Sequence, residues 1–411
     1  MLRILADENI PLVREAFGQL GDVHLLPGRA LSATTVRDAD VLLVRSVTPV
    51  NAALLDGSRV RFVGTATIGT DHVDEDYLRR RGIRFAYAPG SNADSVADYV
   101  TAALIEVAAR LHMTLRGRSL GVVGVGNVGS RVVRRALALG MSVLKNDPPL
   151  ARVTSDPTYL PLDALMECDF VTLHVPLTRA GQDATYHLFD AGLLRQLKRG
   201  AVLINTARGA VVDNGALLAV LQSGHLAAAV LDVWENEPDI RAELLERVTI
   251  GTPHIAGYSL DGKVNGTVML HRALCEFLGV RDEWRPEIHV APPEDAVIEL
   301  TAPAVATSSE PSADACLAAV ATAVRHVYDI WRDDAALRCI LNLPPHQRPQ
   351  YFDRLRKEYP VRREFSRYTV CLRINVCPET AQVLEGLGFR VEVLRPVADA
   401  DGPKMNDTEQ G

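Results

Sequence analysis

Three residues suited to acid–base and carboxylate chemistry follow apolar runs that have the length of buried strands. Arg208 follows A-V-L-I-N-T, Glu237 follows A-V-L-D-V and His254 follows T-I-G-T-P. An arginine fork binds a carboxylate, a histidine exchanges a proton near neutral pH, and a carboxylate holds that histidine in one tautomer. If the strands are parallel, the three side chains meet at one edge of a sheet. They would suit oxidation of a carbon that carries a hydroxyl beside a carboxylate.

Each of these residues also has an ordinary structural interpretation. Arg208 could form a loop salt bridge, Glu237 could cap or solvate a loop before Pro238, and His254 could hydrogen-bond a backbone carbonyl. Their joint position at three strand ends favours the catalytic interpretation.

A glycine-rich turn offers a site for the hydride acceptor. The run L-G-V-V-G-V-G-N-V-G at 120–129 reads as a strand, a tight turn and a helix that begins at Asn127. Gly124 would permit the turn, Gly126 would let a pyrophosphate approach the backbone, and Gly129 would let the helix pack on the strand. This pattern predicts a nicotinamide-dinucleotide site at the helix N-terminus.

A second strand and an acidic residue follow this helix in the expected order. The strand is predicted over Met141–Leu144, and Asp147 lies shortly after it, where a carboxylate would meet the adenosine ribose hydroxyls. Later strands are predicted over 170–175, 201–206, 227–233 and 248–251.

The N-terminal region repeats this alternation without a glycine phosphate turn. Buried parallel strands are predicted over 3–6, 41–45 and 61–65, with helices over 11–20 and 74–81. Polar loops follow two of these strands, R-S-V-T at 45–48 and G-T-A-T-I-G-T-D-H-V-D at 64–74. Ligands bind outside the carboxyl ends of parallel strands, so these loops are expected to face the substrate. A long, nearly uncharged helix is predicted over 92–112.

Length and composition exclude several classes of protein. The chain has 411 residues, which suggests two to three domains, and 47% hydrophobic residues, which is ample for buried cores. The net charge of −7 argues against a general nucleic-acid binder. The N-terminal apolar run breaks at Asp7 and no stretch of 18 apolar residues occurs, so neither a signal peptide nor a membrane span is expected, and the cytoplasm is the expected location. No His or Cys spacing of a known metal site occurs, so no metal is expected.

The C-terminal third differs in composition from the rest. Five prolines between Trp284 and Pro311 predict a connector over 284–311, followed by a module over 312–397 and a polar, disordered tail over 398–411. The stretch Arg348–Arg367 carries seven Lys or Arg residues against three acids. It is either a solvated helix face or a surface that brings cations, Arg362 and Arg363 among them, towards an anionic substrate. The short apolar runs of the module would gain by burial against a twin module in a dimer.

Over residues 1 to about 280 the chain resembles the D-2-hydroxyacid dehydrogenase family. The motifs that carry the resemblance are G-x-G-x-x-G, A-R-G, L-D-V-x-x-x-E-P and P-H, and D-E-N-I-P, V-R-S-V-T and I-G-T-P-H-I-A-G-Y suggest a subgroup whose C-terminal module serves dimerisation. The fold implied is α/β, with two Rossmann-like doubly wound parallel-sheet domains and a smaller α+β C-terminal dimerisation module. The implied boundaries are 1–92 with 255–283 for the substrate domain and 93–254 for the NAD-binding domain.

The resemblance also implies roles for particular residues. Arg208 would bind the substrate carboxylate, His254 would move the proton and Glu237 would support it, with NAD as cofactor and a small phosphorylated hydroxy acid as substrate. Substrate contacts are implied at Ser46, Thr67 and Tyr258, and Arg45 is a candidate for the phosphate end. The implied cofactor contacts are Gly124, Gly126, Asn127, Val128, Gly129, Asp147, Val175, Thr206, Ala207, Arg208, Asp232 and Gly257.

Two positions depart from the family pattern. Val175 stands in L-H-V-P where a threonine is frequent, which removes a side-chain hydroxyl from the cofactor site, and Lys145 close to Asp147 leaves the preference for NAD over NADP open. The competing functions are a dehydrogenase for glycerate-type or 3-phosphoglycerate substrates and a non-catalytic NAD-sensing protein.

Overall fold

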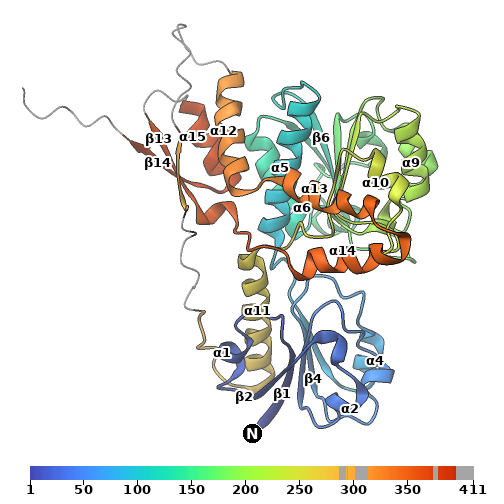
Figure 1. Ribbon diagram of the computed structural model, residues 1–411, viewed down its shortest axis with the longest axis vertical. Helices are drawn as coiled ribbons and strands as arrows, with labels where there is room; N and C mark the ends of the chain where they lie inside the picture. The colour runs from blue at the N-terminus through green and yellow to red at the C-terminus, as the bar shows by residue number, and fades with distance from the viewer. Residues whose placement is uncertain (287–292, 294, 301–312, 374–377, 395–411) are drawn as a thin grey trace, which may run out of the picture.

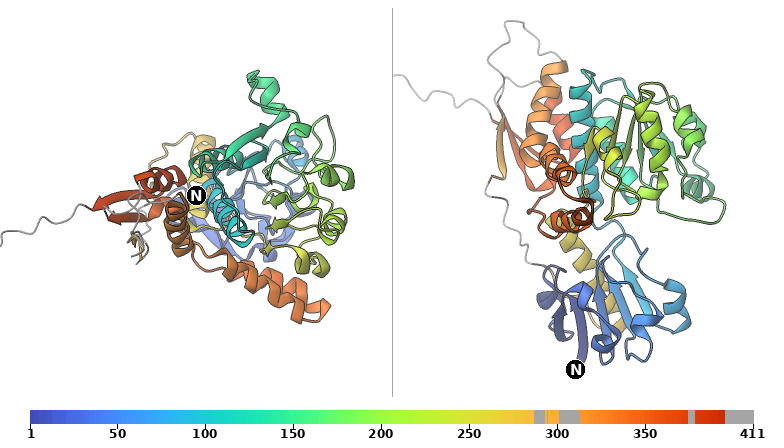
Figure 2. Two further views of the ribbon diagram at one scale, coloured as in Figure 1. Left: turned by 90° about the horizontal axis from the view of Figure 1, so that it is seen from above. Right: turned by 45° about the vertical axis from the view of Figure 1, so that its right-hand side comes forward.

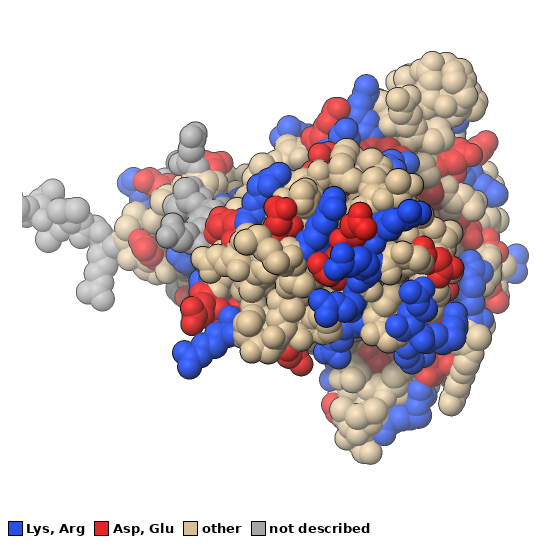
Figure 3. Space-filling view, turned by 90° about the horizontal axis from the view of Figure 1, so that it is seen from below, with Lys and Arg blue, Asp and Glu red and all other residues tan. Residues whose placement is uncertain are grey.

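The fold consists of two parallel-sheet domains and a smaller third unit. A computed structural model of the chain describes residues 1–286, 293, 295–300, 313–373 and 378–394. Figures 1 and 2 show the C-terminal module on one side of the central domain, with the N-terminal domain below. On the face drawn in Figure 3, Lys and Arg groups lie among Asp and Glu groups. None of the helices in these ranges is long and apolar enough to cross a membrane.

The N-terminal domain is built on a five-stranded parallel sheet with strand order β2-β1-β3-β4-β5. Every residue of β3 and β4 is buried, as expected of parallel strands covered on both faces. The strands β2 and β5 were not predicted from the sequence. The elements are β1 (Leu2–Asp7), α1 (Val13–Phe17), β2 (Gly21–Leu26), α2 (Ala33–Val36), β3 (Val41–Val44), α3 (Ala52–Leu55), β4 (Phe62–Thr65), α4 (Glu75–Arg80), β5 (Arg84–Tyr87) and the late helix α11 (Leu260–Leu278).

The central domain has a six-stranded parallel sheet with strand order β11-β10-β9-β8-β6-β7. The strands β8, β9 and β10 are buried throughout. The elements are α5 (Ala93–Arg110), β6 (Ser119–Val123), α6 (Asn127–Ala138), β7 (Ser142–Asn146), α7 (Pro148–Thr154), β8 (Phe170–Leu173), α8 (Ala191–Gln196), β9 (Val202–Asn205), α9 (Asn214–Gln222), β10 (Ala228–Leu231), α10 (Ala242–Arg247) and β11 (Ile250–Gly251). The expected α/β class with two Rossmann-like parallel sheets is confirmed.

In the part that the structure describes, the C-terminal module is a three-stranded sheet, β12-β13-β14, with four α-helices. All its strand pairs are parallel, so the module is not the α+β arrangement expected. The predicted connector over 284–311 is wrong in part, because β12 lies within it and pairs with β13. The elements are β12 (Val297–Leu300), α12 (Ala313–Val327), α13 (Ile330–Arg338), α14 (Arg348–Lys357), β13 (Thr369–Arg373), α15 (Pro378–Leu387) and β14 (Arg390–Leu394). The predicted tail over 398–411 lies outside the described residues.

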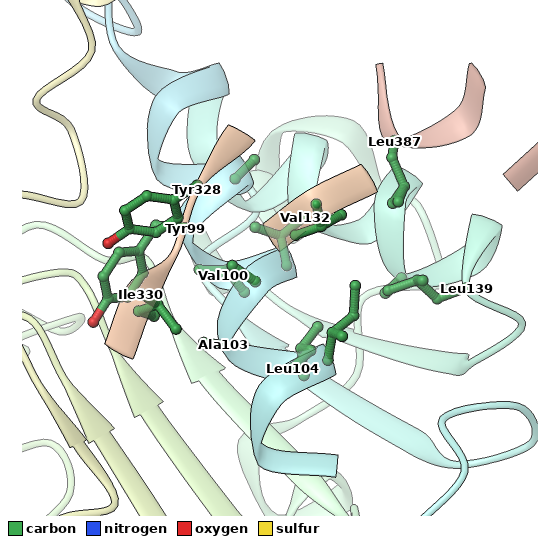
Figure 4. Packing of buried hydrophobic residues seen from close by; sticks show 14 of the residues in the cluster. Tyr99, Val100, Ala103, Leu104, Val132, Leu139, Tyr328, Ile330 and Leu387 are labelled. Carbon is green, nitrogen blue, oxygen red and sulfur yellow. The ribbon is translucent and has the colours of Figure 1, made fainter. Parts of the chain in front are cut away.

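The apolar face of the C-terminal module packs against its own chain. Val320 and Val324 of α12 and Leu384 of α15 belong to one buried cluster with Val100 of α5 and Val132 of α6. Figure 4 shows this packing, with Tyr328 and Ile330 of the module beside Tyr99 and Val100 of α5. Val320 and Val324, from the run over 318–324, are thus already buried against α5 and α6 of the same chain, so their burial does not depend on a twin module, and dimerisation stays a prediction.

Candidate active site

The predicted side chains meet in a cleft between the N-terminal and central domains. A cavity of about 680 Å³ opens there, between the ends of β3 and β4 on one side and the ends of β8, β9 and β10 on the other. The predicted residues that line it are Arg45, Ser46, Thr67, Asn127, Val128, Val175, Thr206, Ala207, Arg208, Asp232, His254, Gly257 and Tyr258. Glu237, Asp147 and the three glycines of the turn lie outside its lining.

Glu237 and His254 form a hydrogen-bonded pair at the edge of the cleft. The Oε2 atom of Glu237 lies 2.7 Å from Nδ1 of His254, and Oε1 accepts the amide of Trp234 at 2.8 Å. Burial alone would raise the pKa of Glu237, but His254 and the Trp234 amide lower it on balance. An ionised Glu237 accepts a hydrogen bond from the Nδ1–H group of His254. This favours the tautomer whose Nε2 lone pair is free to accept a substrate proton.

Hydrogen bonds to Asp232 fix the loop that carries His254. The Asp232 carboxylate accepts hydrogen bonds from the amides of Ile255 and Ala256 at 2.8 and 2.9 Å and from the hydroxyl of Thr252 at 2.7 Å. His254 has a positive φ of 58°, an uncommon backbone conformation for a non-glycine residue. Such conformations persist where the surrounding hydrogen bonds fix them, and they are enriched at functional sites.

Arg208 reaches across the cleft to a loop of the N-terminal domain. Its Nε and one terminal nitrogen donate to a single Asp71 oxygen at 3.0 and 2.9 Å, and the other terminal nitrogen donates to the Ala207 carbonyl. The guanidinium also lies against Gly69, where an added Cβ would be 1.8 Å from it. The Asp71 carboxylate thus already pairs with the Arg208 guanidinium, so this guanidinium is placed where it can bind a carboxylate.

The glycine turn has the shape that dinucleotide binding requires. Gly124 has a φ of 85°, and a Cβ on Gly129 would lie 2.0 Å from the Gly124 carbonyl oxygen, so that helix α6 packs tightly on the turn. A Cβ on Gly126 would meet nothing within 4 Å, which leaves the space that a pyrophosphate needs. The geometry shows the turn at Gly124 and the close packing at Gly129, and pyrophosphate binding beside Gly126 stays a prediction.

Asp147 lies at the end of β7, beside this turn. One carboxylate oxygen accepts the amide of Val125 at 2.8 Å and the other caps α7 through the Leu150 amide at 3.0 Å. Each oxygen keeps a second lone pair, which a ribose hydroxyl could use.

Asp147→Ala should weaken NAD binding by about tenfold or more, since hydrogen bonds to a charged group are lost. It should also narrow the difference between NAD and NADP, because the carboxylate no longer repels a 2′-phosphate. Asp190→Ala, which removes the cap of α8 through Gly192 and Leu193, is the matched control. Titration of both dinucleotides by calorimetry measures the effect, and tighter binding of NADP than NAD to the unaltered protein would contradict it.

His174 is a cleft residue for which sequence reasoning gave no role. Its ring bonds to the hydroxyls of Thr172 at 3.0 Å and Thr206 at 3.3 Å, and it lines the cavity. Burial lowers the pKa of His174 to about 3, so it is neutral at physiological pH. Its position directly after β8, in L-H-V-P, is the sequence feature that could have predicted a place in the cleft.

Two cations of the cleft were also missed. Lys263 of α11 and Arg356 of α14 line the cavity beside Tyr258. By contrast, the expectation that Arg362 and Arg363 face the substrate is wrong, because both side chains are buried elsewhere. Arg362 donates to Ser95 and to the Ala256 carbonyl, and Arg363 pairs with Asp261 at 3.0 Å.

One group of potential metal ligands lies away from the cleft. His271, Cys275 and Asp282 place ligand atoms within 4.8 Å of one another. Asp282 accepts a hydrogen bond from His271 at 2.9 Å and also pairs with Arg272 and Arg285. Two guanidinium groups beside the Asp282 carboxylate disfavour binding of a divalent cation. We therefore interpret these three residues as a hydrogen-bonded cluster that joins the end of α11 to the segment after it.

Comparison with known proteins shows the class to which the chain belongs. The model of the D-isomer specific 2-hydroxyacid dehydrogenase NAD-binding domain matches residues 92–256, and a domain of unknown function (DUF3410) matches residues 301–388. Among solved structures, the TT0316 protein from Thermus thermophilus is similar at 30% identity and a TM-score of 0.58, covering 69% of this chain and 99% of that one. The Aquifex aeolicus D-lactate dehydrogenase complexed with NAD and lactic acid is similar at 26% identity and a TM-score of 0.56, covering 67% and 96%. Fold and site thus define an NAD-dependent dehydrogenase of the D-isomer specific 2-hydroxyacid class.

Full-length relatives narrow the class. The chain is 51% identical to the erythronate-4-phosphate dehydrogenase of Salinibacter ruber over 396 residues, which cover 95% of this chain and 99% of the relative. It is 48% identical to that of Cellvibrio japonicus over 393 residues, 95% of this chain and all of the relative. The chain therefore belongs to the erythronate-4-phosphate dehydrogenase family.

Proposed function

We propose that this protein oxidises 4-phospho-D-erythronate to 2-oxo-3-hydroxy-4-phosphobutanoate with NAD, a step of pyridoxal 5′-phosphate synthesis. The observation that carries the proposal is one cleft that combines the Glu237–His254 pair, the Arg208 fork and a group of cations around Tyr258. A phosphorylated 2-hydroxy acid has matching parts, a hydroxyl to deprotonate between a carboxylate and a phosphate. The names of the similar full-length proteins select this substrate among such acids.

In the proposed reaction, Arg208 binds the substrate carboxylate through its planar fork. His254, neutral at the start, accepts the C2 hydroxyl proton on Nε2 while the C2–H bond breaks, and ionised Glu237 stabilises the imidazolium that forms. Bound NAD supplies the acceptor for the hydride. The products are the 2-oxo acid, NADH and one proton, which His254 later releases to solvent.

Ser46 and Thr67 are proposed to bind the substrate from the N-terminal domain. Both line the cavity, and the Thr67 hydroxyl lies 2.7 Å from that of Thr65 and donates to the Gly69 carbonyl at 2.9 Å. These bonds fix the loop that faces His254 and Arg208 across the cleft.

The cofactor is proposed to lie along the carboxyl edge of the central sheet. The pyrophosphate would meet Gly126, Asn127 and Val128 at the start of α6. Val175, Thr206, Ala207, Asp232 and Gly257 line the cavity and would meet the nicotinamide half of the cofactor.

Asp71 should compete with the substrate carboxylate, because it holds the Arg208 fork. Asp71→Asn should therefore lower the KM for the hydroxy acid by about 1.5- to 5-fold, the size expected for a partly exposed ion pair. Asp76→Asn, which removes a similar pair with Arg79 on the same domain, should leave KM unchanged. Steady-state kinetics measure both, and a raised KM for Asp71→Asn would show instead that Asp71 orients the arginine.

The protein is further proposed to be a homodimer through the C-terminal module. Val297 on β12 and Val393 and Leu394 on β14 are 60%, 59% and 40% exposed, so apolar groups remain uncovered on the edge strands. Sedimentation of the full chain should show a dimer, and a monomer at micromolar concentration would contradict the proposal.

Oxidation of 4-phospho-D-erythronate, unphosphorylated erythronate, glycerate and 3-phosphoglycerate tests the function. The proposal requires the highest kcat/KM for 4-phospho-D-erythronate. Preference for a glycerate-type acid would assign another dehydrogenase, and NAD binding without turnover of any acid would assign an NAD-sensing protein.

A further inference from the structure

Three cations from three parts of the chain converge on the ring of Tyr258. The Arg45 guanidinium, from the loop after β3, lies 5.9 Å from the ring centroid, the Lys263 ammonium of α11 lies 4.7 Å away, and the Arg356 guanidinium of α14 lies 5.7 Å away. All three line the cavity that contains His254. Tyr258 follows His254 by four residues on the same loop, so the ring that the cations surround lies close to the catalytic pair.

No acidic side chain in the described ranges lies within ion-pair distance of these three cations. In the described residues none of them forms a salt bridge within 4 Å, and the buried Nε of Arg356 has no hydrogen-bond partner. Burial lowers the pKa of Arg356, but Tyr258 and the carboxylates of Glu237 and Asp353 raise it on balance, so these two acids face the guanidinium from beyond ion-pair distance. Lys263 is largely desolvated, and burial followed by Arg45 and Arg362 lowers its pKa to about 8. Three like charges around one ring repel each other unless an anion lies between them.

Arg356 is held in place by contacts of α14 on both sides of the cleft. Asp353 pairs with Arg29 of the N-terminal domain at 2.6 Å, and the Tyr351 hydroxyl donates to the Ala336 carbonyl of α13 at 3.1 Å. Phe352 is fully buried in the core of the central domain. Figure 1 shows α14 at the level where the two domains meet. The helix therefore fixes the arginine at the mouth of the cleft.

We propose that Arg356, supplied by the C-terminal module of the same chain, joins Lys263 and Arg45 in binding the phosphate group of the substrate. A phosphate monoester carries a charge of about −1.5 to −2 near pH 7 and three acceptor oxygens. It would supply both a countercharge at ion-pair distance, which Glu237 and Asp353 do not provide, and a partner for the buried Nε. The inference rests on the proposed function and gives the module a role in substrate specificity besides any role in assembly.

Arg356→Ala should lower the preference for phosphorylated substrate. The ratio of kcat/KM for 4-phospho-D-erythronate to that for erythronate should fall by about 10- to 150-fold, the loss expected for hydrogen bonds to a charged group. Arg356→Lys, which keeps the charge without the fork, should lose less. Arg354→Ala is the matched control, because Arg354 lies on the same helix over the Tyr351 ring. Parent-like NAD affinity shows that each variant is folded, and an unchanged substrate ratio in folded Arg356→Ala would overturn the inference.

Inorganic phosphate separates this inference from the proposed function. Calorimetric titration should show phosphate binding to the NAD complex of the parent and at least tenfold weaker binding to that of Arg356→Ala. If the parent does not oxidise 4-phospho-D-erythronate, the proposed function fails, but this titration still decides the inference. Equal phosphate binding by parent and Arg356→Ala would overturn it.

Discussion

Replacing His254 with alanine should lower kcat for hydroxy-acid oxidation by about 10²- to 10⁴-fold, the usual cost of losing one acid–base group. The neutral imidazole is the proposed acceptor of the hydroxyl proton. Two other histidines line the cleft, but His174 is engaged by two threonine hydroxyls and His72 lies 3.0 Å from the Thr65 hydroxyl. Neither has a carboxylate partner like Glu237, so we expect neither to replace His254. NAD affinity should stay close to that of the parent, because the glycine turn lies at the other end of the site.

Glu237→Gln should act through the same imidazole. Without the carboxylate 2.7 Å from Nδ1, the protonated ring is less stable. Oxidation requires the neutral ring, so the acidic limb of the kcat/KM profile should move to lower pH while the maximal rate falls. Glu235→Gln is a close control, since Glu235 bonds to His187 at 2.7 Å and lies outside the cleft lining. A Glu237→Gln profile that superimposes on the parent would refute the pairing.

Removal of the C-terminal module should strongly lower the stability and solubility of the protein. A chain that ends near Asp282 loses Val320, Val324 and Leu384, which are fully buried against α5 and α6. Each such side chain contributes about 1.5–3 kcal/mol when buried, and a domain has only about 5–15 kcal/mol of stability in total. The cut would also expose the central-domain side of the core drawn in Figure 4. We therefore expect an insoluble or unfolded product.

A pair of point variants tests the same packing without truncation. Val324→Asp places a charge in this core, where the native side chain has no exposed surface, and should unfold the protein or strongly lower its Tm. Val361→Asp makes the same change at a site that is 77% exposed and should have little effect. Soluble yield and thermal unfolding report both outcomes. A soluble truncated chain with the parental Tm would show that the N-terminal and central domains fold without the module, and would contradict this expectation.

The sequence was most informative where local pattern and topology agree. Gly124, Gly126 and Gly129 were predicted with their separate roles because a turn between strand and helix imposes strict spacing. Arg208, Glu237 and His254 were predicted to share one edge because parallel strands place their carboxyl ends together. These two rules need no knowledge of how the domains pack.

Residues that meet only through the tertiary path of the chain could not be predicted. Lys263 and Arg356 lie within helical patterns, where a cation is usually solvated. Lys263 reaches Tyr258 from the first turns of α11, and the course of α14 over the cleft brings Arg356 there. Arg362 and Arg363 follow in the same basic stretch but turn into the protein, towards Ser95 and Asp261. The sequence shows the positive charge of the stretch Arg348–Arg367, but it does not show in which direction each side chain points.

Three short strands were also not predicted from the sequence. β2 and β5 were missed because six- and four-residue runs without consistent alternation resemble loops, and proline-rich surroundings hid β12. Each is fixed by its pairing in a sheet: β2 pairs with β1, β5 with β4, and β12 with the more distant β13.

The most direct test of the proposed function is the kcat/KM of the parent protein with NAD for 4-phospho-D-erythronate and for unphosphorylated erythronate, measured side by side. The arrangement of Arg208, His254 and the cations around Tyr258 predicts turnover of both acids, with the phosphorylated one preferred by at least tenfold. Equal turnover of the two acids, or turnover of neither while NAD binds, would contradict the account.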